Sequence, residues 1–367
     1  MKIAILVPYS PLPADTGAKV EIMKHLRILR GLGDCTILSA AGKPVGGGWT
    51  PAAREAIRLE GFNLVLRDET ERLNPRQVFG IAYASLCKAL RMERAFGHSN
   101  PYHRFAFPMK WWREHTAEAD LAVIVLSFWA HLPTRCPKAV VLLDLWSGRM
   151  WEGPGREAAE LSSCDTVVVI SKTEEALLNR LGVRKTLWSP PAVPRWDGPL
   201  TPVVGMVGSD NPTNIEGLRW IEAAGSPPVP IRVYGRLASH VRAPGFDPVG
   251  AYEDPIQPYR DCGVILLTTK QGTGVQIKSI EALAAARAMV ERRGAVCGLP
   301  EADGAWRSVD SPAEMLAEAA SLVRDEPARM RFSQNARAYY LRHLDPDGIT
   351  AAARRAYEQL LARGCTA

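Results

Sequence analysis

The sequence predicts an α/β protein made of two domains, each containing a parallel sheet. Its 367 residues are enough for two domains of the usual ~100–200 residues. Short apolar runs with the length of buried strands alternate with helical patterns, as expected for βαβ units. A proline-rich run without periodicity separates two such series.

The first series contains six apolar runs that we predict to be strands. They cover residues 2–7, 36–38, 63–66, 121–126, 140–143 and 166–170. Predicted helices between and after them include residues 19–32, 75–95 and 173–181. In a parallel sheet of this kind, ligands bind at the carboxyl ends of the strands, so the loops that follow the strands are the first places to look for a site.

The proline-rich run covers residues 188–199 and indicates a linker. We therefore expect a first domain at residues 1–189, a linker at 190–202 and a second domain at 203–347. A last helix, within residues 348–367, is expected to pack back on the first domain.

The second series begins with a predicted strand at residues 202–207, a polar loop and a helix near residues 215–224. Further strands are predicted at residues 231–234 and 263–267, and a helix at residues 324–342.

The most informative stretch is the strand at residues 263–267 with the turn and helix that follow it. Small residues fill the turn at 268–274, and helix formers occupy residues 276–286. The first N–H groups of a helix have no partner inside it, and the helix dipole adds positive charge there. Gly274, Val275 and Gln276 are therefore predicted to cradle a phosphate.

Lys278 and Glu281 are three residues apart, so they lie on one face of this helix. The amine would reach the phosphate, and the carboxylate would accept hydrogen bonds from two ribose hydroxyls. A nucleoside diphosphate satisfies both side chains and the turn. The alternative is that Lys278 and Glu281 are only surface residues of an exposed helix.

The stretch at residues 272–290 resembles the C-terminal nucleotide-sugar motif of family-4 retaining glycosyltransferases of the GT-B fold. That motif has a Glu, seven residues and a second Glu, and Glu281 stands at the second position. Thr273 replaces the first Glu, which in the family contacts the donor sugar. The Gly-x-Gly form with Lys278 is nearer to the bacterial subgroup associated with exopolysaccharide export and surface glycans.

The resemblance assigns roles to four residues of the first half. Gly17 belongs to a loop similar to the family's glycine-containing loop near the donor diphosphate, although such a glycine can simply form a turn. Ser127 aligns with the family's His beside the donor sugar, and His131, four residues later, is a second candidate or a structural histidine. Asp144 resembles an acidic residue of the cleft and is a candidate base, or else a loop cap.

In the second half, the loop after the strand at 202–207 usually carries an Arg and a Lys in the family, and this chain has neither. Gly208, Ser209 and Asn214 are expected to contact phosphate or sugar instead, with helix capping as the alternative for Asn214. Tyr252 follows a glycine at a turn similar to the family's contact with the base.

The excess positive charge lies in the first half of the chain. Residues 1–200 contain 26 Lys and Arg against 20 Asp and Glu, and the remainder contains 19 of each. Residues 88–113 combine six basic with six aromatic side chains, which suits an anionic acceptor or a peripheral contact with a membrane. The alternative is two ordinary helices with solvated basic faces and buried aromatic residues.

No cofactor or metal site is expected. The seven scattered cysteines lack metal-ligand spacing and indicate reduced thiols in a cytoplasmic protein. Asp345 and Asp347 lie between two predicted helices, so we interpret them as a cap and turn. The run at residues 121–132 is too short to cross a bilayer, and the one at residues 3–7 is too short for a signal peptide.

These observations and the resemblance together imply a GT-B glycosyltransferase. It would move a sugar from a nucleotide-diphosphate-sugar to the hydroxyl of an acceptor, such as a glycan, a lipid-linked sugar or a small glycoside, with retention and without a metal. Three alternatives stay open: a nucleotide-sugar epimerase, a non-catalytic nucleotide-sugar-binding protein and a nucleic-acid-binding protein, the last without any supporting module signature.

Overall fold

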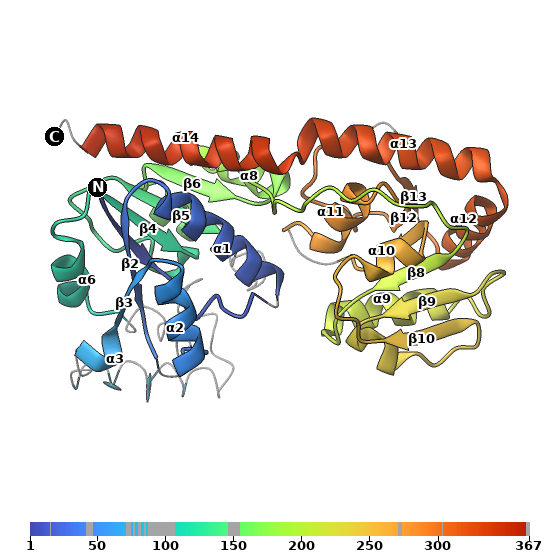
Figure 1. The fold of residues 1–367 in the computed structure, drawn as a ribbon, viewed down its shortest axis with the longest axis horizontal. Coiled ribbons are helices and arrows are strands. Elements are labelled where there is room, and N and C mark those ends of the chain that lie inside the picture. The colour runs from blue at the N-terminus through green and yellow to red at the C-terminus, as the bar shows by residue number, and fades with distance from the viewer. Residues whose placement is uncertain are drawn as a thin grey trace. The chain divides into compact units, whose positions relative to one another are not determined.

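A computed structural model describes residues 1–14, 16–41, 47–70, 75, 78–79, 82–83, 86, 107–145, 155–270, 274–302 and 304–364. The chain divides into two compact units. The first comprises Met1–Pro191 and Ile349–Ala367, and the second comprises Ala192–Gly348. Each unit is an α/β layer structure around one parallel sheet (Figure 1).

The first unit contains a seven-stranded sheet in the order β3-β2-β1-β4-β5-β6-β7, in which every pair is parallel. Its strands are β1 (Lys2–Leu6), β2 (Asp34–Ser39), β3 (Asn63–Leu66), β4 (Leu121–Val125), β5 (Lys138–Leu142), β6 (Thr166–Val169) and β7 (Thr186–Trp188). Its described helices are α1 (Gly17–Arg30), α2 (Pro51–Leu59), α3 (Arg67–Thr70), α6 (Met109–Thr116), the short η2 (Ser127–Trp129), α7 (Gly155–Leu161), α8 (Lys172–Arg180) and most of α14 (Pro346–Gly364).

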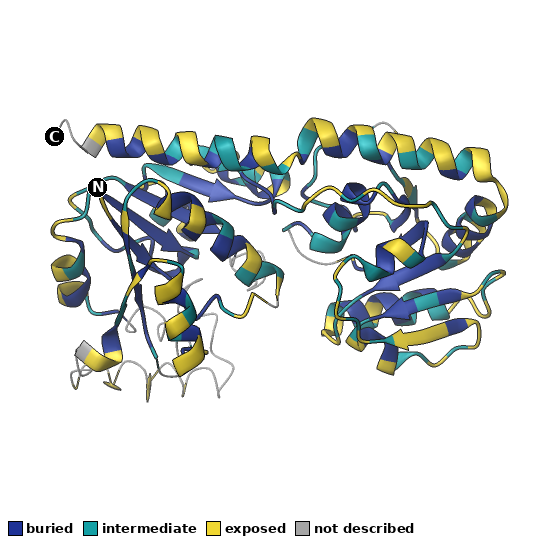
Figure 2. Ribbon diagram, viewed as in Figure 1, coloured by how far each residue is buried: buried dark blue, intermediate teal, exposed yellow. Residues whose placement is uncertain are grey.

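The apolar runs of this unit form strands because both faces of the sheet are covered. Successive side chains of a strand point to opposite faces. Accordingly, Ile3 and Ile5 belong to one core cluster, and Ala4 and Leu6 belong to the other. The inner strands β4 and β5 are accordingly buried at all five positions, without alternation, and Figure 2 shows the middle of the sheet in the colour of buried residues.

The last helix packs on the first unit. Ala353, Tyr357, Leu360 and Leu361 of α14 share a core cluster with side chains of α1. Asp345 precedes α14 and its Oδ2 accepts a hydrogen bond of 2.8 Å from the N–H of Gly348. This bond confirms the interpretation of Asp345 as a cap.

The second unit contains a six-stranded parallel sheet in the order β10-β9-β8-β11-β12-β13. Its strands are β8 (Val204–Val207), β9 (Ile231–Tyr234), β10 (Phe246–Gly250), β11 (Val264–Leu267), β12 (Ala288–Arg292) and β13 (Arg307–Val309). Its helices among the described residues are α9 (Pro212–Glu222), η3 (Arg236–His240), α10 (Gln257–Asp261), α11 (Ile277–Ala284), α12 (Pro312–Arg324), α13 (Glu326–His343) and the start of α14.

The order of the strands is that of a dinucleotide-binding fold, 3-2-1-4-5-6 when the unit is numbered from its first strand. The prediction of two α/β domains with parallel sheets is confirmed. Trp188, the first residue of the proline-rich run, is the last residue of β7 and pairs with Val169 of β6. Residues 189–203 form no helix or strand.

Candidate functional site

The sheet of the second unit has its topological switch point between β8 and β11. The chain leaves β8 toward one side of the sheet and β11 toward the other, because β9 and β12 are their respective outer neighbours. The loops after these two strands therefore diverge at their carboxyl ends, where α/β sheets of this type bind ligands. The loop after β8 contains Gly208 and Ser209, and the one after β11 contains Thr268 and Thr269.

Two glycines allow the backbone segments around this point to approach each other. Gly235, after β9, has a φ of 82°, and a Cβ there would lie 2.3 Å from the carbonyl oxygen of Gly208. Gly217 of α9 faces the end of β11, and a Cβ there would lie 2.6 Å from Oγ1 of Thr268. Both distances are shorter than real contacts, so larger residues would push the loops apart.

Asn214 lies in the first turn of α9 but does not cap it. The cap is Asn211, whose Oδ1 accepts the N–H of Asn214 at 2.8 Å. The alternative interpretation of Asn214 as a helix cap is therefore wrong. Its own Nδ2 donates to the carbonyl oxygen and to Oγ of Ser209, at 3.1 and 3.2 Å. The amide oxygen, Oδ1, therefore remains available to accept hydrogen bonds from other residues.

Lys278 joins the two loops. Its Nζ donates to Oδ1 of Asn214 at 3.0 Å and to Oγ1 of Thr269 at 2.9 Å. Thr269 Oγ1 also donates to the same Asn214 oxygen, at 2.9 Å. Burial lowers the pKa of Lys278 to about 8, because the ammonium loses hydration, and the Glu281 carboxylate opposes this shift.

The turn before α11 is described from Gly274 onward, and Thr273 lies outside the described residues. Val275 is buried, and Gly274 is half-buried. Gln276 is the residue before α11, and its Nε2 donates to the carbonyl oxygens of Thr269 at 2.6 Å and Ala295 at 2.9 Å. Its amide therefore fixes the turn against β11 and does not point to solvent.

Glu281 lies one turn beyond Lys278 and is held by Tyr259 of α10. The Tyr259 hydroxyl, in a side chain that is 1% exposed, donates to Glu281 Oε2 at 2.6 Å. No described residue donates to the other carboxylate oxygen, Oε1. Burial raises the pKa of Glu281, whereas Tyr259 and the Lys278 ammonium lower it.

Tyr252 lies close to the same carboxylate. Burial raises the pKa of Tyr252 to about 12, and the negative charge of Glu281 adds to this shift. Its ring packs edge-on against Tyr234, with the ring centroids 6.2 Å apart. The structure therefore brings Tyr252, Lys278, Glu281 and Asn214 together around α11.

The first unit has its own switch point between β1 and β4, and the four site residues predicted in the first half follow β1, β4 and β5. Gly17 is the first residue of α1, after the cap Thr16, whose Oγ1 accepts the N–H of Lys19 at 3.4 Å. Asp144 follows β5 and is half-buried. Burial and then the negative charge of Asp144 raise the pKa of Tyr9, so the carboxylate and the phenol lie near one another.

Ser127 and His131 are turned toward α7. Ser127 is 3% exposed, and its Oγ donates to Glu157 Oε1. His131 Nδ1 lies 4.0 Å from Glu160 Oε2. Leu126, between β4 and Ser127, has a φ of 75°, a region that costs a non-glycine residue about 1–3 kcal/mol.

Part of the basic and aromatic segment at 88–113 is explained by packing. Phe107, Trp111 and Trp112 belong to the core of the first unit, whereas Lys110 and Arg113 are exposed. Residues 88–106 lie outside the described residues.

Two side chains of the candidate site were missed at the sequence level, Thr269 and Tyr259. Thr269 has a recognisable signal, since it is a polar residue directly after a buried strand in a parallel sheet. Tyr259 has none, because only the folding of α10 against α11 brings its hydroxyl to Glu281.

Within the described ranges, no group of three or more His, Cys, Asp or Glu side chains could hold a metal ion. No helix in these ranges has the length and apolar content needed to cross a membrane.

No protein-family model and no curated protein sequence matches this chain. Solved structures do match it. Anabaena Alr3699/HepE in complex with UDP-glucose has a TM-score of 0.69 and 14% identity, over 98% of this chain and 100% of that one. A TarM mutant from S. aureus in complex with fondaparinux, alpha-GlcNAc-glycerol and UDP has a TM-score of 0.64 and 11% identity, over 98% and 99%.

A glycosyltransferase from Rickettsia africae matches with a TM-score of 0.58 and 11% identity, over 98% of both chains. The chain has the GT-B fold. This confirms the predicted fold class.

Proposed function

We propose that this protein is a glycosyltransferase that uses a nucleotide-diphosphate-sugar as donor and the hydroxyl of a glycan or glycoside as acceptor. One observation carries the proposal. Lys278, with Asn214 and Thr269 as its hydrogen-bond partners, lies at the switch point of a dinucleotide-binding sheet, one turn from Glu281. The likeness to structures solved with UDP and UDP-glucose supports it and makes UDP the first nucleotide to test.

In this proposal, Lys278 and the first N–H groups of α11 stabilise the diphosphate as its negative charge develops. Before the ligand binds, Asn214 and Thr269 accept hydrogen bonds from the Lys278 ammonium and orient it toward the loop after β8. Because a positive side chain and a helix dipole then supply the charge, no metal ion is invoked.

Glu281 would hold the ribose. Tyr259 fixes one of its oxygens, and the other is directed to the ribose hydroxyls in our proposal. Tyr252 would lie against the base. In the first unit, Asp144 is the candidate for positioning or deprotonating the acceptor.

The finer assignment is part of the proposal. We infer a retaining reaction of family-4 type in a bacterial surface-glycan pathway, carried out in the cytoplasm or at the inner face of the membrane. These inferences rest on the sequence resemblance around Lys278 and Glu281 and on the positive charge of the first half.

The test is a thermal-shift panel of nucleoside diphosphates and nucleotide-sugars, followed by a turnover assay on the best ligand. A ligand that binds only the folded state raises the melting temperature. We expect stabilisation by a nucleotide-sugar, and release of the nucleoside diphosphate when an acceptor sugar is added. Conversion of the nucleotide-sugar without an acceptor would instead identify an epimerase. Binding without any turnover across acceptors would identify a non-catalytic binding protein.

A further inference from the structure

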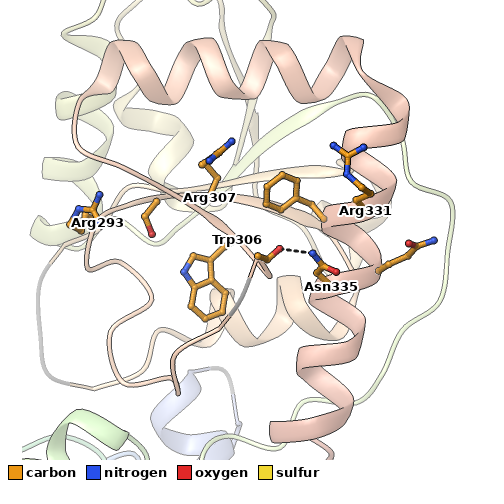
Figure 3. A pocket seen from close by; sticks show the side chains of 9 residues that line it. Arg293, Trp306, Arg307, Arg331 and Asn335 are labelled. Carbon is orange, nitrogen blue, oxygen red and sulfur yellow. Dashed lines mark hydrogen bonds between the residues drawn. The ribbon is translucent and has the colours of Figure 1, made fainter.

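A cavity in the second unit is lined by none of the residues that form the candidate donor site. It has a volume of about 770 Å³, within the range of roughly 300–1,000 Å³ typical of ligand pockets. Its lining comes from the segment after β12, from the approach to β13 and β13 itself, and from α13 (Figure 3). None of its described lining residues lies in α9, α10 or α11, which surround Lys278.

The lining is strongly basic. Three arginines face the cavity, Arg293, Arg307 and Arg331, and none of the described lining residues is acidic. Arg293 is neutralised by two hydrogen bonds to Asp310, at 2.7 and 2.9 Å. Arg307 donates from Nε to Glu318 Oε1 at 3.1 Å, and its other nitrogens donate to no described residue.

Arg331 differs from the other two. It is exposed on α13, and no described carboxylate forms an ion pair with it. The cavity therefore presents the guanidinium donors of Arg331 and the remaining donors of Arg307. Guanidinium groups match carboxylate, sulfate and phosphate oxygens with paired hydrogen bonds.

An indole forms another part of the wall. Trp306 is half-buried and packs edge-on against Tyr339, with centroids 5.2 Å apart and an interplanar angle of 74°. Tyr339 is itself fixed, since its hydroxyl donates to the carbonyl oxygen of Pro300 at 2.7 Å. The indole is thus a preorganised flat apolar surface, of the kind on which a sugar ring can pack.

Amide groups complete the lining. Asn335 donates Nδ2 to the carbonyl oxygen of Gly304 at 3.0 Å, shown as the dashed line in Figure 3, so its Oδ1 is left to accept a hydrogen bond. Gln334 lies beside it on α13. Amides suit hydroxyl groups, because they both donate and accept.

We propose that this cavity binds an anionic oligosaccharide, with a sugar ring on Trp306 and its acidic group on Arg331 and Arg307. The combination of unpaired guanidinium donors, a fixed indole and amides matches a ligand that carries charge, an apolar ring face and hydroxyls together. This goes beyond the proposed reaction, since the cavity shares no described residue with the donor site.

The experiment is calorimetric titration of the full chain, without nucleotide, with trigalacturonate, maltotriose 6-phosphate, neutral maltotriose, inorganic phosphate and a six-nucleotide thymidine oligomer. We expect at least one charged trisaccharide to bind about tenfold more tightly than neutral maltotriose and inorganic phosphate. Tighter binding of trigalacturonate would indicate a carboxylated glycan, and tighter binding of maltotriose 6-phosphate would indicate a phosphorylated one.

Two matched variants locate the binding. Arg331→Ala should weaken the charged trisaccharide about tenfold, whereas Arg342→Ala, which removes an exposed arginine elsewhere on α13, should not. Trp306→Ala should also weaken it, with the thermal melt showing whether the loss of contact with Tyr339 has unfolded the unit.

Failure of both charged trisaccharides to bind, equal losses in the two arginine variants, or tighter binding of the thymidine oligomer would overturn the proposal. Lys278→Ala separates this site from the donor site. It should leave trisaccharide affinity unchanged, and Arg331→Ala should leave UDP affinity unchanged, so either site can fail without the other.

Discussion

The Nζ atom of Lys278 donates a hydrogen bond of 3.0 Å to Oδ1 of Asn214, which lies 64 residues earlier in the chain. The orientation of the Asn214 amide is fixed from its other end, because Nδ2 donates to the backbone of Ser209. An amine in the first turn of α11 and an acceptor in the first turn of α9 thus hold the two sides of the switch point together.

Replacement of Lys278 by Ala should weaken the binding of UDP by about 1.5–3 kcal/mol, the usual range for a hydrogen bond to a charged group. The measurement is calorimetric titration with UDP. Lys185→Ala removes an equal charge from an exposed position that forms an ion pair with Asp165, and should have no effect. Unchanged UDP affinity in the Lys278 variant would show that Lys278 does not contact the diphosphate.

The affinity for UDP should fall as the pH rises. Because burial lowers the pKa of Lys278 to about 8, the amine of the free protein loses its proton at higher pH, while the diphosphate binds the ammonium. The apparent dissociation constant should therefore increase about tenfold between pH 7 and pH 9. Lys278→Arg keeps its charge and should show a flat profile, so a flat wild-type profile would contradict the assignment.

The same burial means that the charged Lys278 should lower the free energy of unfolding. Its folded pKa lies below the value of 10.5 for a free lysine, so the unfolded chain binds the proton more tightly and the penalty is fully present below pH 8. Lys278→Met should raise the melting temperature at pH 7 although it weakens UDP binding, a trade-off common at functional sites. The difference should shrink between pH 8 and 10.5, and a variant less stable than wild type at pH 7 would refute this.

The sequence was sufficient to predict the two parallel sheets, because strands covered on both faces are apolar throughout, as in β4, where all five residues are buried. It also predicted the β11–α11 junction, since the switch from an apolar run to small residues and then to helix formers is local. The proline-rich run at 188–199 begins one residue inside the first sheet, because Trp188 pairs with Val169 of β6, and a pairing between residues that far apart is not visible in the local sequence pattern.

The partners of the site residues were harder to predict. Lys278 and Glu281 follow from their spacing, but their contacts with Asn214 and Tyr259 depend on which loops the fold brings together. Ser127 illustrates the opposite case. It aligns with a site position, but in the structure its hydroxyl donates to the buried Glu157, a partner 30 residues later that no local pattern reveals.

Tyr259→Phe should weaken UDP binding through Glu281. Without the hydroxyl, Glu281 Oε2 loses its donor, and the carboxylate is no longer held toward the ribose. We expect a loss of about 1 kcal/mol, the usual contribution of a hydrogen bond. The effect should vanish with 2′,3′-dideoxy-UDP, which lacks both hydroxyls. An equal loss with the two ligands would mean that Tyr259 acts on the fold and not on the ribose.

A last prediction concerns the buried contact that joins α14 to α1. Tyr357 is fully buried, and its hydroxyl lies 2.9 Å from Nδ1 of His25, whose Nε2 lies 3.1 Å from Oε1 of Glu21. Burial and the nearby Lys24 ammonium lower the pKa of His25, so the imidazole is neutral at pH 7. In that state, Nδ1 accepts a hydrogen bond from the Tyr357 hydroxyl and Nε2 donates one to Glu21. Tyr357→Phe leaves that nitrogen buried without a donor and should destabilise the protein by about 1–3 kcal/mol in urea unfolding.

The pH dependence follows from the same contact. The folded pKa of His25 lies below 6.5, so the unfolded chain binds the proton more tightly, and stability should fall as the pH decreases from 6.5 toward the folded pKa. His25→Gln cannot titrate and should reduce the slope of stability against pH in that window. If the slope persisted unchanged in His25→Gln, or if Tyr357→Phe were as stable as wild type, the neutral His25–Tyr357 hydrogen bond would not be what holds α14 on α1.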